Sequence, residues 1–136
     1  MDKFSICLDI GGTKILGAIF NKNRDIVYRL KKKTKAKEGA QNVEETIVSV
    51  VEEMLEGYKI TIDDVDAISA GAPGVINQET GVILFSPNLP WRNYPIRKAL
   101  EDRFHTPFFI GNDVNVGVYG EWKYGAAQGL SQVAGL

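Results

Sequence analysis

The residues with the clearest chemical potential are Asp9–Lys14, which read Asp-Ile-Gly-Gly-Thr-Lys between two apolar segments, Phe4–Leu8 and Ile15–Phe20. Two adjacent glycines let the backbone approach a ligand closely, and their N–H groups, the threonine hydroxyl and the lysine ammonium can face one anion. The aspartate beside a bound phosphate would favour a Mg²⁺ ion between them. An ordinary hairpin turn fits the same pattern, so this motif alone leaves both interpretations open. The candidate phosphate and metal ligands are Asp9, Gly11, Gly12, Thr13 and Lys14.

A second polar pair, Asn112 and Asp113, follows the short apolar segment Pro107–Ile110. We expect this pair to open a helix directly after a strand. The asparagine side chain both donates and accepts hydrogen bonds, which suits a ligand with neighbouring hydroxyl groups. Either residue also fits the simpler role of a helix N-cap, which the pair by itself favours.

Four segments in this order resemble the ROK family of sugar kinases and sugar-responsive repressors: Asp9–Lys14, Ala70–Gly74, Ser86–Trp91 and Asn112–Gly125. The resemblance covers essentially the whole chain and is strongest toward the glucokinases of that family. It implies the actin-like ATPase fold, with this chain as its ribonuclease H-like N-terminal half. Four ordered motifs are far more specific than any one of them, so the resemblance favours the functional interpretation of each.

The resemblance also implies a role for each segment. ATP would transfer its γ-phosphoryl group to the 6-hydroxyl of glucose, and Asp113 would be the catalytic base that accepts the proton of that hydroxyl. The turn formed by Gly11, Gly12 and Thr13, called the glycine turn below, would hold ATP together with Lys14. Mg²⁺ would bind to Asp9 through water. The expected hexose ligands are Gly74, Asn88, Asn112 and Asp113. For Gly74 and Asn88 a purely turn-forming role is the alternative, and Trp91 is expected to pack rather than bind.

Composition limits the classes of function. The 136 residues are 44% hydrophobic and 24% charged, as in one globular domain with its own core. A net charge of −1 gives no electrostatic surface for nucleic acid. Cys7 is the single cysteine, which excludes a disulfide and suits a reducing compartment. No apolar run approaches membrane-spanning length. We therefore expect a cytoplasmic protein whose partners are a hexose and ATP, without nucleic acid or membrane.

The remaining sequence predicts the elements that position these motifs. A helix from about Ala40 to Tyr58 is indicated by apolar residues at helical period, and a second helix is expected from Tyr94 to near His105. The basic run Lys31–Lys37 indicates a solvated edge strand and loop rather than an anion site. The predicted strands are Phe4–Leu8, Ile15–Phe20, Ile26–Leu30, Val65–Gly71, Val82–Phe85 and Phe108–Ile110. Their order favours an α/β fold in which helices flank a mixed five-stranded sheet.

Members of the family are longer, so residues 1–136 are expected to be the N-terminal domain of an actin-like sugar kinase. A second phosphate loop, an adenine pocket and a structural zinc site are expected only in a C-terminal half. On its own this domain should be inactive and should self-associate, since half a cleft leaves both substrates solvated.

Two rival interpretations remain. A ROK repressor would carry a DNA-binding domain before this fold, for which a first strand at Phe4 leaves no room, and such repressors often lose the glycine-turn residues. Alternatively, the chain is an isolated domain without catalysis. The choice among glucose, fructose and amino sugars, and between ATP and polyphosphate as donor, is left open.

Overall fold

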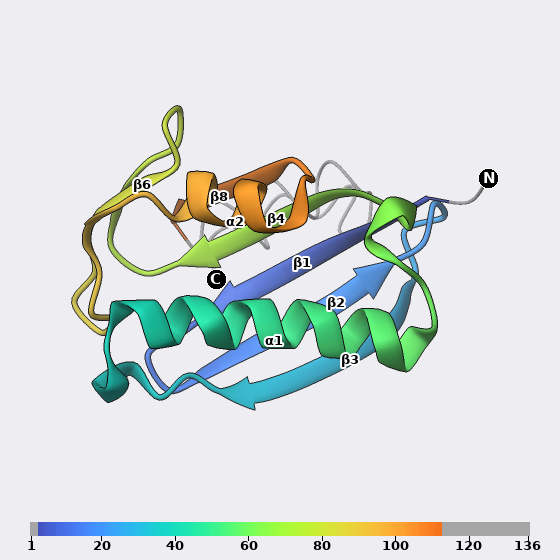
Figure 1. Cartoon of the computed structure of the whole chain (residues 1–136), viewed down its shortest axis with the longest axis horizontal. Coiled ribbons are helices and arrows are strands. Elements are labelled where there is room, and N and C mark those ends of the chain that lie inside the picture. Colours follow the sequence, from blue (N-terminus) through green and yellow to red (C-terminus); the bar gives the residue numbers. More distant parts are fainter. Residues whose placement is uncertain (1–2, 113–136) are drawn as a thin grey trace, which may run out of the picture.

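A computed structural model describes residues 3–112, in which a twisted five-stranded sheet carries two α-helices (Figure 1). The strand order is β3 (Ile26–Lys33), β2 (Lys14–Phe20), β1 (Phe4–Ile10), β4 (Val65–Ala72) and β8 (Phe108–Asn112). The pairs β1–β2 and β2–β3 are antiparallel, and β1–β4 and β4–β8 are parallel. The predicted mixed five-stranded sheet is therefore confirmed.

Helix α1 (Ala40–Tyr58) has the predicted bounds and lies across β2 and β3 (Figure 1). Its buried residues recur at helical period, as the sequence indicated: Val43, Ile47, Val48, Val50, Val51, Met54 and Leu55. Tyr58 is the last residue of the helix, and the left-handed backbone of Lys59 (φ 62°) caps it. Two short 3-10 helices, Ala36–Glu38 and Ile62–Asp64, flank α1.

Gly17 of β2 lies directly beneath α1. A Cβ atom built on it would lie 2.7 Å from Met54 Cε and 2.9 Å from Val50 Cγ1, so this contact has no room for a side chain. We expect Gly17→Ala to lower the free energy of unfolding by about 1–3 kcal/mol, measured by urea denaturation, because the buried Met54 and Val50 side chains must move away from the added methyl group. Adding Met54→Leu should return part of that loss, and strict additivity of the two changes would contradict the contact.

A second, three-stranded antiparallel sheet follows β4. Its strands are β5 (Val75–Asn77), β6 (Val82–Phe85) and β7 (Arg92–Tyr94). Only β6 was predicted, because β5 and β7 have three residues each and are too short to show an alternating pattern. Helix α2 (Ile96–Phe104) begins two residues later than predicted, because Tyr94 ends β7 and Pro95 is the N-cap, and it buries Ile96, Leu100 and Phe104.

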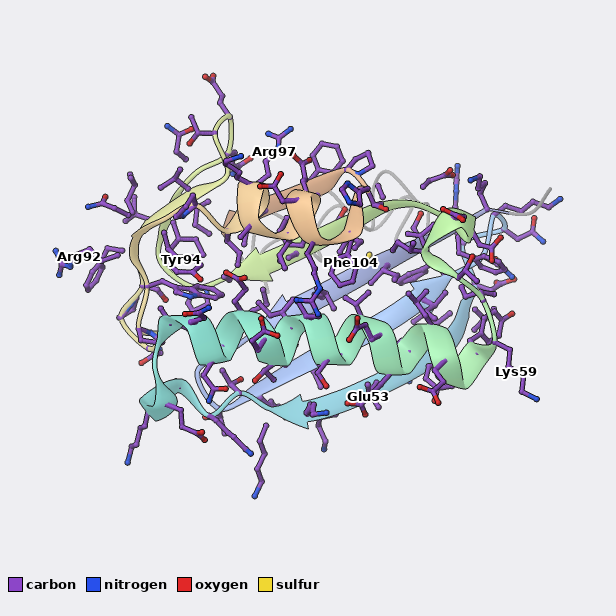
Figure 2. The ribbon with its side chains drawn as sticks, viewed as in Figure 1. Glu53, Lys59, Arg92, Tyr94, Arg97 and Phe104 are labelled. Atoms are coloured by element: carbon purple, nitrogen blue, oxygen red, sulfur yellow. The ribbon has the colours of Figure 1, made fainter. Side chains whose placement is uncertain are left out.

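The second sheet is joined to the start of α1. Tyr94 reaches from β7 toward α1, where its hydroxyl donates to the Glu44 carboxylate, and its ring stacks on Trp91 (Figure 2). The indole Nε1 of Trp91 donates to the Ala40 carbonyl at 3.2 Å, and the side chain is 1% exposed. Trp91 therefore packs, as expected, and holds the second sheet against the N-terminal end of α1.

Several predicted boundaries differ from the structure, and two of them bear on the candidate site. Asn112 is the last residue of β8 rather than the first of a helix, because the parallel ladder with β4 continues to the pair Ala72–Asn112. Strand β3 runs on to Lys33, into the basic run, because β2 pairs with it as far as Lys14. The position of β3 at the sheet edge agrees with the prediction. Asp113 and the helix expected after it lie outside the described residues.

Candidate functional site

The candidate residues come from strands that end side by side. Strands β1, β4 and β8 are parallel neighbours, with Asp9 beside Gly71 and Ala72 beside Asn112. The carboxyl ends of these strands therefore lie side by side along one edge of the sheet, which runs across the strand ends. The glycine turn, the residues around Gly74 (the Gly74 segment) and Asn112 lie at that edge. In open α/β sheets, ligands bind outside the carboxyl ends of the strands. Asp113 is the next residue in the sequence and lies outside the described residues.

The glycine turn is a hairpin between β1 and β2, closed by the pair Ile10–Ile15 and by the Gly11 N–H, which donates to the Lys14 carbonyl at 3.0 Å. The hairpin interpretation is thus correct for the backbone. A hairpin backbone is compatible with phosphate binding by the groups that the turn exposes. The Gly11 N–H is used inside the turn. The groups left to face an anion are the Gly12 and Thr13 N–H groups and the exposed side chains of Thr13 and Lys14.

Thr34, which the sequence interpretation missed, holds this turn from behind. It is 0% exposed, its hydroxyl donates to the Gly11 carbonyl at 2.6 Å, and its N–H donates to the Thr13 carbonyl at 2.9 Å. The available signal was a single threonine inside a run of lysines, too weak to indicate a contact with a turn on another strand.

Gly12 contacts the second candidate turn. A Cβ atom at residue 12 would lie 2.7 Å from the Asn88 carbonyl oxygen and 2.8 Å from Asn88 Cβ. Contacts this short exclude any side chain at residue 12 unless the Asn88 turn moves. The candidate phosphate turn and the candidate sugar turn, far apart in sequence, therefore touch through backbone atoms.

The Asn88 turn belongs to a loop that is closed at its base and anchored in the core. The Ser86 N–H donates to the Trp91 carbonyl at 3.3 Å, and Leu89 and Trp91 are buried. Asn88 itself is exposed. An exposed asparagine on a loop with buried anchors can form hydrogen bonds to a polar ligand.

Gly74 supports the same loop. Its φ of +118° is a backbone conformation that favours glycine, and a Cβ atom there would lie 2.2 Å from the Phe85 carbonyl oxygen and 2.9 Å from Ser86 Cα. Both observations explain this glycine by structure, as the turn-forming alternative expected. They also place its backbone directly beside the start of the Asn88 loop.

Positive charge gathers at the glycine turn. Lys14 and Lys33 are exposed cross-strand neighbours on β2 and β3, an arrangement that is unfavourable unless an anion offsets the charge. Lys32, on the opposite face of β3, instead donates to Ser49 and Glu53 of α1. That interaction lowers the pKa of the Glu53 carboxyl. Among residues 3–112, neither Lys14 nor Lys33 has an ion pair with a carboxylate.

The described residues contain no group of three or more His, Cys, Asp or Glu side chains that could hold a metal by themselves. Asp9, exposed near the end of β1, fits a different kind of site, in which Mg²⁺ keeps its waters and contacts substrate phosphates. Burial raises the pKa of the Cys7 thiol to about 11, which makes it a poor metal ligand. Within residues 3–112, no helix has the length and hydropathy to cross a membrane.

Comparison with known proteins identifies similar sequences of one family. The model of the ROK family matches residues 5–136. A glucokinase of Halalkalibacterium halodurans is 30% identical over 132 residues, which cover 97% of this chain and 40% of that protein. A xylose repressor of Caldicellulosiruptor bescii is 28% identical over 120 residues, covering 88% of this chain and 30% of that protein.

Among solved structures, a ROK family glucokinase from Streptomyces griseus in complex with glucose and AMPPNP superposes with a TM-score of 0.78. It is 32% identical in sequence, and the match covers 93% of this chain and 38% of that chain. The chain thus spans about two fifths of the length of this glucokinase structure and of the Halalkalibacterium halodurans glucokinase.

Proposed function

The chain belongs to the ROK family and has the actin-like ATPase fold of its sugar kinases, and on that premise we propose that the complete protein phosphorylates a hexose with ATP. Glucose is the first candidate, since a glucokinase relative and a glucose-bound structural neighbour are similar to this chain. Residues 1–136 would form its N-terminal domain. The observation that carries the proposal is the contact of Gly12 with Asn88, which joins a turn suited to phosphate with a turn suited to a polyol.

In the proposed reaction the sugar 6-hydroxyl oxygen attacks the γ-phosphorus, and the bond from that phosphorus to the ADP oxygen breaks. The Gly12 N–H, the Thr13 hydroxyl and the Lys14 ammonium bind phosphate oxygens, while Asn88 and Asn112 hold sugar hydroxyls. Asp113 orients the attacking hydroxyl and accepts its proton. Mg²⁺, held near Asp9 through water, would neutralise charge on the phosphates. Because the transition state is loose, positioning does most of this work.

A sugar-responsive repressor is the alternative, since a xylose repressor is also similar. The lysine pair Lys14–Lys33 beside an intact glycine turn favours the kinase, because a repressor that only senses sugar has no use for a phosphate site. A coupled assay of the complete protein should detect ADP formation that depends on a hexose, with glucose, fructose and amino sugars compared, and with polyphosphate as a second donor. Sugar binding without phosphoryl transfer from either donor would favour the repressor.

Lys14→Ala in the complete protein should raise the KM for ATP by about tenfold or more and leave the KM for sugar within about twofold. The reason is that its ammonium lies at the glycine turn and is removed without a change in packing, since the side chain is exposed. Lys31→Ala, two residues before Lys33 on the same exposed face of β3, is the matched control and should behave as wild type. An equal rise of both KM values would show that Lys14 has a structural role instead.

A further inference from the structure

Thr34 is one of three buried polar residues in the described part of the chain, with Ser86 and Thr106. It follows the last residue of β3 and precedes Lys35, whose backbone is left-handed (φ 57°) and turns the chain away. Burying a hydroxyl costs free energy unless the group makes a hydrogen bond, and here it makes one of 2.6 Å to the Gly11 carbonyl. The threonine therefore enters the core to reach the glycine turn.

The contact replaces a bond that ordinary hairpins make within themselves. In a two-residue hairpin the flanking residues exchange two hydrogen bonds, each donating to the other's carbonyl. Here the Gly11 N–H donates to the Lys14 carbonyl, but the Gly11 carbonyl accepts from the Thr34 hydroxyl. A second hydrogen bond, from the Thr34 N–H to the Thr13 carbonyl, holds the turn on the other side of Gly12.

The hydrogen bond to the Gly11 carbonyl also fixes the direction of the Gly12 N–H. The peptide between Gly11 and Gly12 is planar and trans, as are all the peptide bonds of the described residues, so its N–H points opposite to its carbonyl. Because the Gly11 carbonyl points toward buried Thr34, the Gly12 N–H points away from Thr34. That N–H is the donor which a phosphate oxygen would meet at this turn.

We propose that Thr34 is a positioning residue for the phosphoryl donor, which fixes the orientation of the Gly11–Gly12 peptide so that the Gly12 N–H meets a phosphate oxygen. This inference rests on the proposed kinase function. The lysine pair at the same turn supplies charge but no direction, since an ammonium is a point charge on a flexible stem. Thr34 orients the Gly12 N–H without contacting the phosphoryl donor itself.

The test uses the complete protein and three variants. Thr34→Val keeps the shape and removes the hydroxyl, Thr34→Ser keeps the hydroxyl, and Thr106→Val is the matched control. Thr106 is also buried and its hydroxyl also donates to a backbone carbonyl, that of Phe104 at 3.2 Å, but it precedes β8 and so lies at the opposite edge of the sheet. For each protein the KM for ATP, the KM for glucose, kcat and the midpoint of thermal unfolding are measured.

Thr34→Val should raise the KM for ATP by about tenfold and change the KM for glucose by less than about twofold, while Thr34→Ser stays close to wild type. Thr106→Val should lose thermal stability without a selective effect on ATP. If Thr34→Val does not fold, Thr34→Cys replaces it and must show the same selective rise, because a thiol is a weak donor.

Three results would overturn the inference: equal effects on both substrates, no effect of Thr34→Val, or a Thr34→Ser variant as impaired as Thr34→Val. Wild-type protein that binds no ATP and phosphorylates no hexose would overturn the proposed function and this inference together. Active wild-type protein with an unchanged Thr34→Val variant would overturn the inference alone.

Discussion

Asp113→Asn in the complete protein is expected to lower kcat by about 10²–10⁴-fold, the usual cost of losing a general base. The KM values for sugar and ATP should change little, because an amide of the same shape keeps the packing and still hydrogen-bonds to a hydroxyl. Asp113 follows Asn112 in the sequence, and Asn112 ends β8 at the edge of the sheet where the glycine turn and the Gly74 segment also lie. Steady-state kinetics in the coupled assay measure each quantity.

Asp102→Asn is a suitable control for this substitution. Asp102 is an exposed carboxylate on α2 that forms a surface ion pair with Lys98, so its loss should leave kcat unchanged. An Asp113→Asn variant that retains more than about a tenth of wild-type kcat would remove Asp113 from the role of base. The N-cap role would then be the better explanation of this residue.

Gly12→Val should lower kcat/KM by about 10²-fold and weaken the binding of both substrates. From the sequence alone, this substitution is expected to affect ATP far more than sugar, because it blocks the approach of phosphate to the backbone. The structure changes that expectation. A side chain at residue 12 would collide with the Asn88 backbone at 2.7 Å, so the sugar turn must move as well.

The comparison with Lys14→Ala makes the Gly12 prediction specific. Both residues belong to one turn, but a substitution at residue 12 adds a side chain against Asn88, whereas Lys14→Ala removes an exposed one, so only Gly12→Val should raise the KM for sugar. Gly12→Ala should show the same pattern with smaller changes, since it adds the clashing Cβ but no branch. If Gly12→Val weakens ATP alone, the two turns are not coupled through this contact.

Much of the fold could be predicted from the sequence because it depends on local patterns. The apolar residues recur at helical period between Ala40 and Tyr58, and both ends of α1 lie where this pattern predicts them. The same spacing predicts the buried face, since it decides which side of a helix packs on the core. The apolar runs on either side of Asp9–Lys14 predict the β1–β2 hairpin, and four ordered motifs indicated the family that the comparison confirms. The roles of Asp9, Asn88 and Asp113 stay predictions.

What only the tertiary structure decided is how separate segments meet. Strands β5 and β7 are too short for a pattern and form because β6 offers its two edges. Asn112 lies in a strand because β4 provides a partner as far as Ala72. The Thr34 hydroxyl on Gly11 and the contact of Gly12 with Asn88 each join residues that have no local relation. Such contacts follow from strand register and from the close packing of backbone on backbone, which local composition does not encode.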